Sequence, residues 1–270
     1  MSTGIYFNRN YFSENKIYID RIKSVLNNNS IECKIVNGID DLEGLEILFI
    51  LGGDGTILNI ASECAVRGVK IVGINYGHLG FLTEFEPSQV NDALECVVGN
   101  KFNIIKRSML DITYNDKNYS ALNDFVIQRS TSGNQFSNIV HIRAEIDGSI
   151  VDDFSSDGLI VCTPTGSTAY SLSAGGSVLT PDLNAFEITS ICAHSLHSRP
   201  VVYSYSSILK VNPHNNSSLL NIIVDGRIVD QIDDSVEITV KKSNHFVEFI
   251  SKRKENFFEK LFIKLNIWSK

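Results

Sequence analysis

The sequence contains no long apolar run. No stretch approaches the roughly 20 consecutive apolar residues that a membrane-spanning helix needs, and the mean hydropathy is only +0.01. The first residues, MSTGIYFNRN, lack the basic region followed by an apolar region that marks an export signal. We therefore expect a cytoplasmic protein that has no membrane partner.

Cysteine is scarce and scattered. The chain has 5 cysteines, and they form no CxxC pair and no Cys/His cluster. A structural zinc site is therefore not expected. We favour free, mostly buried thiols in a reducing compartment.

Basic residues are outnumbered by acidic ones. The 24 Lys and Arg against 31 Asp and Glu give a net charge of -7. A protein that binds nucleic acid over its whole surface is normally basic, so we expect no nucleic-acid partner. An acidic chain can still hold a phosphate-rich ligand locally, through backbone N–H groups, helix N-termini, a metal ion or a few placed cations.

What the chain does have is an average globular composition, with 43% hydrophobic and 20% charged residues in 270. Its first third alternates between strand-like and helix-like segments. The apolar run 46–51 stops at two glycines, as a buried parallel strand does, and a helix is predicted from about Thr56 to Arg67. This alternation predicts an N-terminal doubly wound, Rossmann-like α/β domain over residues 1–103. Further strands are predicted at 5–7, 31–36 and 69–74, and further helices at 16–26 and 88–98.

From about residue 104 the runs become short, β-branched and alternating. Turn residues such as Asn115-Asp116 and Asp147-Gly148 separate them, which is typical of an antiparallel sandwich or barrel. We therefore predict a C-terminal β-sandwich-like domain over 104–249. The strands are predicted at 109–114, 125–129, 139–146, 158–162, 201–205, 218–224 and 235–240.

The tail, about 250–270, is expected to pack back on the α/β domain. Residues 256–268 are predicted to form an amphipathic helix. A basic amphipathic helix can also lie on a membrane surface, but Glu255 and Glu259 would oppose anionic lipid, so docking on the protein itself is favoured. The apolar face would consist of Phe257, Leu261, Leu265 and Trp268, with Lys260 and Lys264 on other faces.

A glycine-rich turn, Gly52-Gly53-Asp54-Gly55-Thr56, joins the apolar strand to the predicted helix. Its small residues let backbone approach a phosphate, and the helix N-terminus supplies free N–H donors and a partial positive charge. We therefore predict that Gly52, Gly53, Gly55 and Thr56 bind ATP phosphates. Asp54 would repel a phosphate unless it coordinates Mg²⁺ or accepts a proton from an attacking hydroxyl. The alternative is a tight turn with Asp54 as a capping residue.

Two common nucleotide motifs are missing. The turn lacks the further glycines and the acidic residue that the dinucleotide fingerprint needs, and no Walker A lysine follows it. An oxidoreductase is therefore disfavoured.

Three further segments carry polar or aromatic groups suited to a nucleoside. Residues 77–82 follow the next strand, so they would lie at the same sheet edge as the glycine-rich turn; there Phe81 could stack on a base and His78 could orient a loop. Asn123-Asp124 offers an amide and a carboxylate for ribose hydroxyls or a base edge. Residues 156–176 follow a buried strand with small hydroxyl residues, glycines and Tyr170, which suits a polar, neutral ligand.

Each of these segments also has a bland interpretation. Phe81 is by itself an ordinary core aromatic, Asn123-Asp124 an ordinary turn before a strand, and 156–176 a Ser/Gly-rich loop. Asp225-Gly226-Arg227 is by itself only a hairpin turn.

Taken together, the segments resemble those of the NAD kinase family, whose members phosphorylate the adenosine ribose of NAD with ATP. The resemblance covers residue 46 to the C-terminus, and the block from Asp157 to Gly176 is its most specific part. The Gly-Gly-Asp-Gly-Thr turn is shared with diacylglycerol and sphingosine kinases. The remaining matching positions are Gly77 to Phe81, Asn123-Asp124, His194, Arg199-Pro200 and Asp225-Gly226.

The resemblance implies a two-domain homodimer or homotetramer that binds NAD and ATP, with Mg²⁺ or another divalent cation. Asp54 would be the catalytic carboxylate. The implied substrate-binding residues are Gly55 and Phe81 at the adenosine end, Asn123, Asp124, Thr165, Thr168 and Ala169 at the adenine and its ribose, Asp157 and Ser173 at the nicotinamide end, Tyr170 as a support, and Asp225 near the phosphates or the reacting ribose.

The sequence departs from the family pattern at two positions. The family usually has Glu where this chain has Asp124, which is one methylene shorter, and many members have Arg where this chain has Ser155. The function expected from the resemblance is NAD kinase activity. The alternatives are a lipid kinase that shares the glycine-rich turn, and a sensor that binds NAD or NADP without catalysis.

Overall fold

The computed structural model describes residues 1–9, 12–75, 80–130, 139–214, 219–233, 236–253 and 257–268. Met1–Arg107 and His245–Lys270 form one unit, called unit 1 below, and Ser108–Asn244 form unit 2. Unit 1 is thus built from both ends of the chain and unit 2 from its middle.

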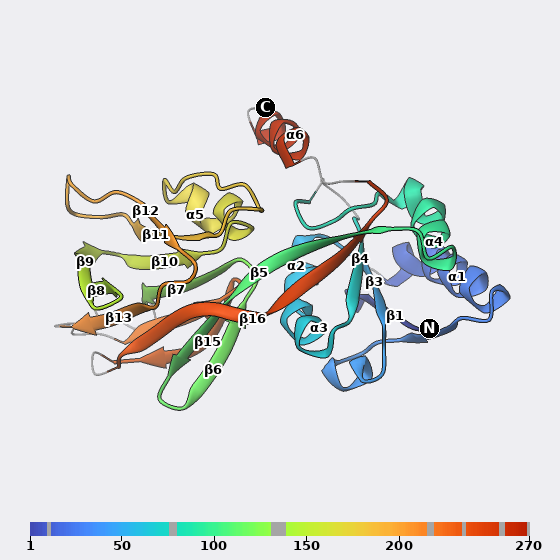
Figure 1. The fold of residues 1–270 in the computed structure, drawn as a ribbon, viewed down its shortest axis with the longest axis horizontal. Helices are drawn as coiled ribbons and strands as arrows, with labels where there is room; N and C mark the ends of the chain where they lie inside the picture. Colours follow the sequence, from blue (N-terminus) through green and yellow to red (C-terminus); the bar gives the residue numbers. More distant parts are fainter. Residues whose placement is uncertain are drawn as a thin grey trace. The chain divides into compact units, whose positions relative to one another are not determined.

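Unit 1 is built on parallel strands in the order β2-β1-β3-β4. All residues of β3 are buried, as in a strand that is covered on both faces. The helices α1 and α4 cover one face, and α2 and α3 cover the other (Figure 1). The predicted doubly wound α/β fold is therefore confirmed. The elements are β1 (Ser2–Phe7), α1 (Phe12–Asn28), β2 (Glu32–Ile35), β3 (Ile47–Leu51), α2 (Asp54–Leu58), α3 (Ala61–Arg67), β4 (Lys70–Ile74) and α4 (Val90–Val98), with short 3-10 turns at Ile39–Leu42 and Pro87–Gln89.

The helix predicted from Thr56 to Arg67 is wrong, because the chain forms two short helices there. α2 ends at Leu58 and α3 begins at Ala61, since Ile60 leaves the helical region with φ -134° and ψ -7°. The apolar residues in this segment keep the spacing of one continuous helix, so the pattern could not reveal the break. Ile60 is buried in its non-helical conformation, and this burial outweighs the continuity of the helix.

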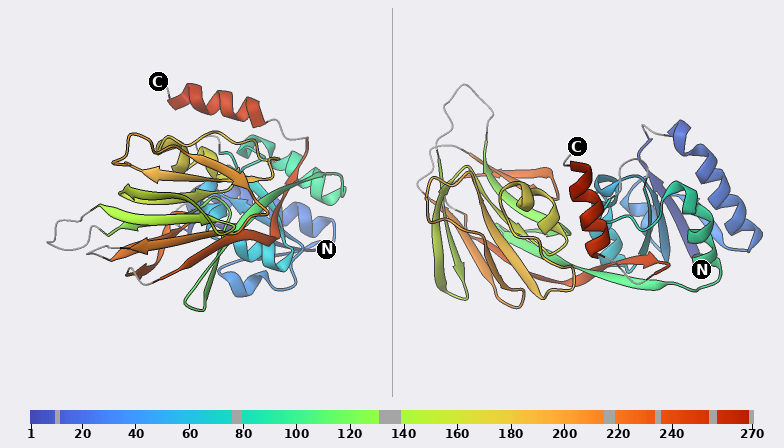
Figure 2. Two further views of the ribbon diagram at one scale, coloured as in Figure 1. Left: turned by 60° about the vertical axis from the view of Figure 1, so that its left-hand side comes forward. Right: turned by 90° about the horizontal axis from the view of Figure 1, so that it is seen from above.

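Unit 2 has two layers of strands around a shared core (Figure 2). One layer is an antiparallel sheet in the order β12-β11-β10-β7-β14-β15. In the other layer β16, β13, β8 and β9 are neighbours, and β5 pairs with β16 and β6. The predicted β-rich second part is therefore confirmed. The strands are β5 (Asn103–Tyr114), β6 (Lys117–Ala121), β7 (Asp124–Arg129), β8 (Val140–Ile146), β9 (Ser149–Ser156), β10 (Gly158–Cys162), β11 (Ala185–Ile191), β12 (Val201–Ser204), β13 (Leu209–His214), β14 (Leu220–Val224), β15 (Arg227–Ile232) and β16 (Ile238–Ser251).

The predicted turns connect neighbouring strands. Asn115-Asp116, Asp147-Gly148 and Asp225-Gly226 each have two successive residues with positive φ, which is the geometry of two-residue hairpins. The first joins β5 to β6, the second β8 to β9 and the third β14 to β15.

The last strand, β16, runs much further than the predicted 235–240. It pairs with β13 near its start, and near its end Phe249 lies opposite Ile71 of β4 in parallel. The helix α6 (Phe257–Trp268) follows. Within the described part of the chain, no helix combines the length and apolar character needed to cross a bilayer, and the five cysteines are free, three of them buried.

Candidate functional site

Asp54 lies at the carboxyl edge of the parallel strands of unit 1, as predicted. It is the first residue of α2, and Gly53 is the N-cap, whose carbonyl accepts a hydrogen bond from Thr56 N at 3.0 Å. The N–H of Gly52 donates to Ile74 O at 3.0 Å, which ties the turn to the end of β4. The N–H of Gly52 is therefore already used within the fold.

The segment after β4 holds the Asp54 carboxylate. Phe81 N donates to Oδ2 at 2.9 Å and Leu82 N donates to Oδ1 at 3.1 Å. A Cβ at Gly80 would collide with Oδ1 of Asp54, so a larger residue there would displace the carboxylate. The predicted meeting of the two loops at one sheet edge therefore occurs, whereas His78 and Gly77 lie outside the described residues.

Thr83 adds a buried hydroxyl beside this carboxylate. A Cβ at Gly80 would come within 2.8 Å of Thr83 Oγ1 as well as against Asp54 Oδ1, so the two oxygens border the same point. Thr83 Oγ1 is buried and has no hydrogen-bond partner among the described residues. Thr83 was not among the site residues predicted from the sequence.

Two lysines of α6 reach the same region, which the sequence did not predict. Lys260 Nζ bonds Glu84 Oε1 at 2.5 Å and Thr83 O at 3.2 Å. Lys264 Nζ lies 4.0 Å from Asp54 Oδ2 and 4.9 Å from the centre of the Phe81 ring. The ring of Phe257 lies 6.3 Å from that of Phe81.

The predicted apolar face of α6 is therefore wrong in part. Leu265 is 44% exposed and Phe262 is 70% exposed, whereas the side chains of Lys260 and Lys264 keep only 17% and 16% of their exposure. Lysine can bury its aliphatic stem and place its charge on a carboxylate, and here the two acidic partners on unit 1 select the inward face. The side chain of Trp268 lies outside the described part.

In unit 2, Asp225 organises the start of β7. Its Oδ1 accepts hydrogen bonds from Asn123 N at 2.7 Å and Asp124 N at 3.2 Å, and its Oδ2 accepts one from Leu122 N at 2.9 Å. The Asp225-Gly226 hairpin turn presents this carboxylate, and Asp225 N donates back to Asp124 O at 3.0 Å. Asp225 therefore shapes the Asn123-Asp124 pair.

Asp124 and Asp225 are both buried and lie next to each other, so a negative charge on one disfavours a negative charge on the other. Burial, and then the neighbouring Asp225, raise the pKa of Asp124 to about 7. Burial also raises the pKa of Asp225, but its three backbone donors oppose the rise. Hydrogen bonds to a carboxylate favour its charged form, so a negative charge is better stabilised on Asp225 and a proton on Asp124.

The segment after β10 folds against Asn123. Thr163 N donates to Asn123 O at 2.9 Å, and Thr163 Oγ1 donates to Leu122 O at 2.6 Å and accepts from Gly166 N at 3.1 Å. A Cβ at Gly166 would collide with the Asn123 carbonyl. Asn123 Oδ1 is buried and, in the part of the chain that is described, has no hydrogen-bond partner, so it is available to a ligand.

The predicted nucleoside-contacting residues Thr165, Thr168 and Ala169 form the next turn. Thr165 and Thr168 are buried, the Thr168 hydroxyl donates to Thr165 O at 3.3 Å, and Ala169 N donates to Gly166 O at 2.9 Å. This turn comes directly after Gly166, so its place against the Asn123 carbonyl is fixed.

Glu187 of β11 is a buried carboxylate that was not predicted from the sequence. It accepts hydrogen bonds from the same segment. Its Oε1 accepts from Ser177 N at 2.7 Å, and its Oε2 accepts from Ser171 Oγ at 2.9 Å. Burial raises the pKa of the Cys162 thiol, which donates to Oε2 at 3.7 Å. Glu187 thereby ties α5 (Tyr170–Ser173) to the sheet. Its only sequence signal is one acidic residue in an apolar strand.

Asp157 and Tyr170 lie at the other end of the β7–β10 pair. Asp157 forms an ion pair with Arg129 at 3.1 Å, and Tyr170 OH accepts from Gln128 Nε2 at 3.3 Å. In the register Cys162 faces Asp124 and Gly158 faces Gln128, so these groups lie roughly 13 Å from Asp124 along the strands. Ser173 is exposed on α5. The predicted unit 2 residues therefore form two groups along one strand pair.

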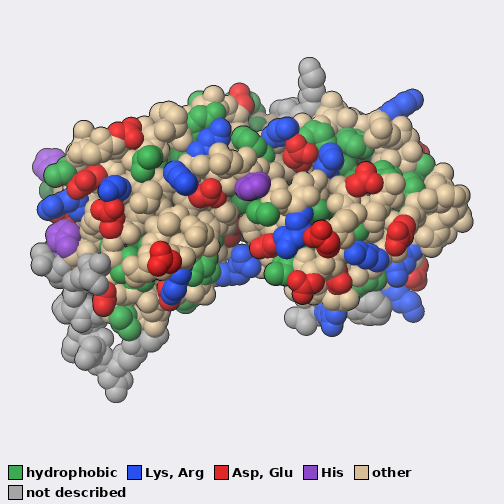
Figure 3. Space-filling model, turned by 60° about the horizontal axis from the view of Figure 1, so that its bottom comes forward, with side chains coloured by type: hydrophobic (Ala, Val, Ile, Leu, Met, Phe, Trp, Pro, Cys, Tyr) green, Lys and Arg blue, Asp and Glu red, His purple; other side chains and the backbone are tan. Residues whose placement is uncertain are grey.

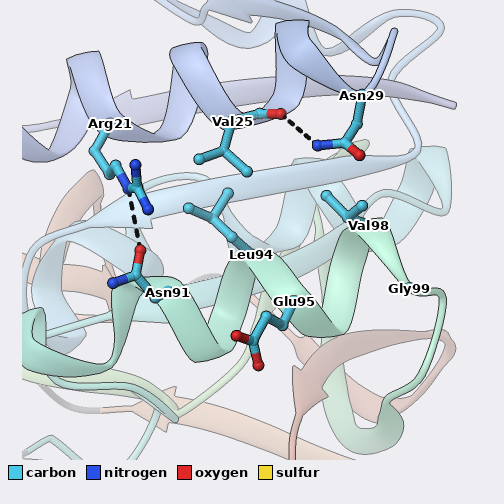
Figure 4. Close-up of a pocket in the computed structure, with 8 residues that line it drawn as sticks. All are labelled: Arg21, Val25, Asn29, Asn91, Leu94, Glu95, Val98 and Gly99. Atoms are coloured by element: carbon cyan, nitrogen blue, oxygen red, sulfur yellow. Dashed lines mark hydrogen bonds between the residues drawn. The ribbon is translucent and has the colours of Figure 1, made fainter.

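A separate groove of about 570 Å³ lies between α1 and α4 (Figure 4). Arg21 Nε donates to Asn91 Oδ1 at 3.1 Å across it, and Leu94 and Val98 point into it. None of the residues that line it is a predicted site residue, so it is not part of the candidate site.

Two models of one protein family match successive parts of the chain. The model of the ATP-NAD kinase N-terminal domain matches residues 14–102, and that of the ATP-NAD kinase C-terminal domain matches residues 122–252. The NAD kinase of Caldanaerobacter subterraneus subsp. tengcongensis is 42% identical over 225 residues, which are 82% of this chain and 78% of that protein. The NAD kinase of Caldicellulosiruptor bescii is 34% identical over 260 residues, covering 96% and 97%.

Solved structures show the same fold. An NAD kinase from Archaeoglobus fulgidus in complex with ATP has a TM-score of 0.81 and 26% identity, over 98% of this chain and 99% of that one. Yeast NADH kinase complexed with NADH has a TM-score of 0.86 and 23% identity, over 99% and 89%. The matched family models and the names of the relatives identify a phosphotransferase. The chain belongs to the ATP-NAD kinase family.

Proposed function

We propose that this chain is an NAD kinase, which transfers the γ-phosphoryl group of ATP to the 2′-hydroxyl of the adenosine ribose of NAD. The observation that carries the proposal is the Asp54 carboxylate, held by the backbone N–H groups of Phe81 and Leu82 at the sheet edge. One family model spans Asp54, the other matches residues 122–252, and the relatives are named NAD kinase. A lipid kinase and an oxidoreductase have no comparable support.

Asp54 acts as the proton acceptor in this reaction. The 2′-oxygen forms a bond to the γ-phosphorus, the bond from that phosphorus to the β,γ-bridging oxygen breaks, ADP leaves, and the hydroxyl proton passes to the carboxylate. Because two N–H groups fix Asp54, its orientation needs no rearrangement at the moment of reaction.

The unit 2 residues hold the dinucleotide. Asn123, whose buried Oδ1 has no partner within the described residues, contacts the adenosine together with Asp124, Thr165, Thr168 and Ala169. Asp157 and Ser173 meet the nicotinamide end, and Tyr170 flanks the nucleoside. Asp225 positions Asn123 and Asp124 through the three N–H groups that its oxygens accept, and it lies near the phosphates or the reacting ribose.

A divalent cation such as Mg²⁺ would neutralise charge on the ATP phosphates. Mg²⁺ commonly keeps several waters and takes one or two carboxylates beside substrate phosphates. The described residues contain no group of three or more His, Cys, Asp or Glu that could hold a metal. The residues fit an ion that is carried by ATP, with Asp54 as the available carboxylate.

We place the enzyme in the cytoplasm as a homodimer or homotetramer. Free cysteines suit a reducing compartment, and the edge strands β12 and β15 each expose an apolar side chain, Val202 and Ile228.

The test is a coupled assay of the purified protein with Mg-ATP and NAD that measures the NADP formed. We expect Asp54→Asn to lower turnover at least about 1000-fold with NAD binding kept, while Asp92→Asn, at the surface of unit 1, retains parent activity. Near-parent turnover by Asp54→Asn would refute the role of Asp54. Phosphorylation of diacylglycerol instead of NAD, or tight NAD binding without turnover by the parent, would support the lipid kinase or the sensor.

A further inference from the structure

The phosphate-binding side of the Asp54 turn is short of positive charge. The predicted helix of twelve residues, with its dipole, is replaced by the five-residue α2, so the field at its N-terminus is weaker than the sequence suggests. The N–H of Gly52 is bonded to Ile74 O, and the turn has no Walker A lysine. A triphosphate carries several negative charges, so a cation is needed close to the reacting phosphoryl group.

The described part of the chain brings such a cation to Asp54 from the far end of the sequence. Lys264 Nζ lies 4.0 Å from Asp54 Oδ2 and 4.9 Å from the centre of the Phe81 ring. Its side chain is only 16% exposed, and this partial burial strengthens its electrostatic interactions relative to those of a surface lysine. Phe81 in turn donates its N–H to the same oxygen, Oδ2.

The neighbouring contacts of α6 hold this lysine in place. Lys260 is paired with Glu84 at 2.5 Å, and Glu84 also accepts from Ser251 Oγ at 3.0 Å. The Phe257 ring packs against Phe81. One turn beyond Lys260, Lys264 lies on the same face of the helix and reaches the reacting carboxylate instead.

We propose that Lys264 is a phosphate-contacting catalytic residue, which supplies the side-chain cation for the γ-phosphoryl group of ATP. The inference rests on the proposed function, because Asp54 must face the attacking hydroxyl. The phosphoryl group that this hydroxyl attacks then lies next to Asp54, and so within reach of an ammonium group 4.0 Å from it. Lys264 therefore acts on ATP and not on the diphosphate of NAD.

The experiment compares Lys264→Met and Lys264→Arg with the parent. Methionine keeps an unbranched stem over Phe81 without the charge, and arginine keeps the charge. We expect Lys264→Met to lower kcat/KM for ATP at least about tenfold, as expected for losing a hydrogen bond to a charged group, with KM for NAD within about twofold. Arginine should restore most of the loss.

Two control variants distinguish the loss of the lysine charge next to Asp54 from a general loss of charge and from weaker docking of α6. Lys252→Met removes one charge from unit 1 at a residue paired with Asp92, and it should leave the kinetics unchanged. Lys260→Met weakens the docking of α6 without removing the charge of Lys264, so its loss of kcat/KM for ATP should be smaller than that of Lys264→Met.

A second measurement uses inorganic tripolyphosphate as a competitive inhibitor, whose inhibition constant should rise about tenfold in Lys264→Met.

Several results would overturn the proposal while the proposed function stands. These are an active Lys264→Met enzyme with parent kcat/KM for ATP, a gain of activity that reveals an inhibitory ion pair with Asp54, equal losses for ATP and NAD, or the same ATP defect in Lys260→Met. An inactive parent enzyme would instead refute the proposed function itself.

Discussion

Two carboxyl groups buried side by side show how the backbone distributes charge in unit 2. Asp225 accepts three N–H groups and Asp124 lies next to it with 4% exposure. A charged Asp124 would lack that compensation, so the proton is held there near neutral pH. A protonated carboxyl group can donate a hydrogen bond to a ribose oxygen. A charged carboxylate cannot donate and can only accept a hydrogen bond from a ribose hydroxyl.

This arrangement predicts a pH dependence of stability. The pKa of Asp124 is about 7 in the folded chain against an ordinary aspartate value of 3.8, so between these values the folded state binds more protons than the unfolded state. The free energy of unfolding therefore falls as pH rises through this window, by at most about 1.4 kcal/mol per pH unit from this group, and levels off above pH 7. Asp124→Asn should remove this part of the slope.

Urea unfolding of the parent and of Asp124→Asn at pH 5, 6, 7 and 8 measures the difference. Asp152→Asn, an exposed residue of β9, serves as the control and should keep the parent slope. Equal slopes for the parent and Asp124→Asn would show that Asp124 is ionised in the folded chain at all these pH values.

At this scale the sequence indicated where the glycine-rich turn lies in the fold but not which side chains surround it. The glycine-rich turn and Phe81 follow neighbouring parallel strands, so their meeting at one sheet edge of unit 1 could be inferred from the alternating pattern. Lys264 could not be inferred, since it is about 210 residues from Asp54 and the helical period places it away from the apolar residues. Only the tertiary fold brings a lysine on α6 to that carboxylate.

Among the elements, α5 and the turns around it depend on one strand residue. Glu187 of β11 accepts hydrogen bonds from Ser171 and Ser177, on either side of Gly176. The side chain is fully buried, so these donors are the groups that compensate its desolvation. The segment that carries Thr168, Ala169 and Tyr170 is therefore held from inside the sheet.

We expect Glu187→Gln to loosen this segment. The amide has one acceptor oxygen, so Ser177 N or Ser171 Oγ loses its partner, and the free energy of unfolding should fall by about 1–3 kcal/mol. KM for NAD should rise more than KM for ATP, because Asp54 and Lys264 belong to unit 1. Urea unfolding and steady-state kinetics measure both effects.

Glu237→Gln gives the matched control, since Glu237 forms an exposed ion pair with Lys210 and such pairs contribute little. If Glu187→Gln matched this control in both stability and KM, Glu187 would not be what positions the segment.

The elements themselves were predictable where the pattern was long or ended at a clear signal. The strand 158–162 and the hairpin turns agree with the prediction because buried β-branched runs and positive-φ residues have local causes. The break between α2 and α3 and the inward face of α6 have tertiary causes, which are the burial of Ile60 and the acidic partners of Lys260 and Lys264. β11 was missed because Glu187 interrupts its apolar pattern.

For the whole molecule, the net charge of -7 results from 24 basic and 31 acidic residues. On the face drawn in Figure 3, basic and acidic side chains lie among one another. A ligand with many phosphates therefore finds its cation at a particular place, such as Lys264, rather than over a broad basic surface.

The proposed oligomer also belongs to this scale. In unit 2, β15 is an edge strand, and Ile228 on it is 63% exposed, which favours pairing with another copy. Light scattering after gel filtration should give two or four times 30.0 kDa, and Ile228→Lys should shift the mass towards the monomer. A parent mass of 30.0 kDa, or an Ile228→Lys variant that assembles like the parent, would contradict the use of this edge.

The division of unit 1 between both ends of the chain has a consequence for how the protein is made. The ribosome releases residues 108–244 before Val247, Phe249 and Ile250, and these three are buried beside the earlier strands of unit 1. Domains that are contiguous can fold during synthesis, so unit 2 can form while unit 1 still lacks its last strand. The contact between Lys264 and Asp54 is then among the last to be made, so the nascent chain can complete unit 2 before the Asp54 carboxylate gains its lysine neighbour.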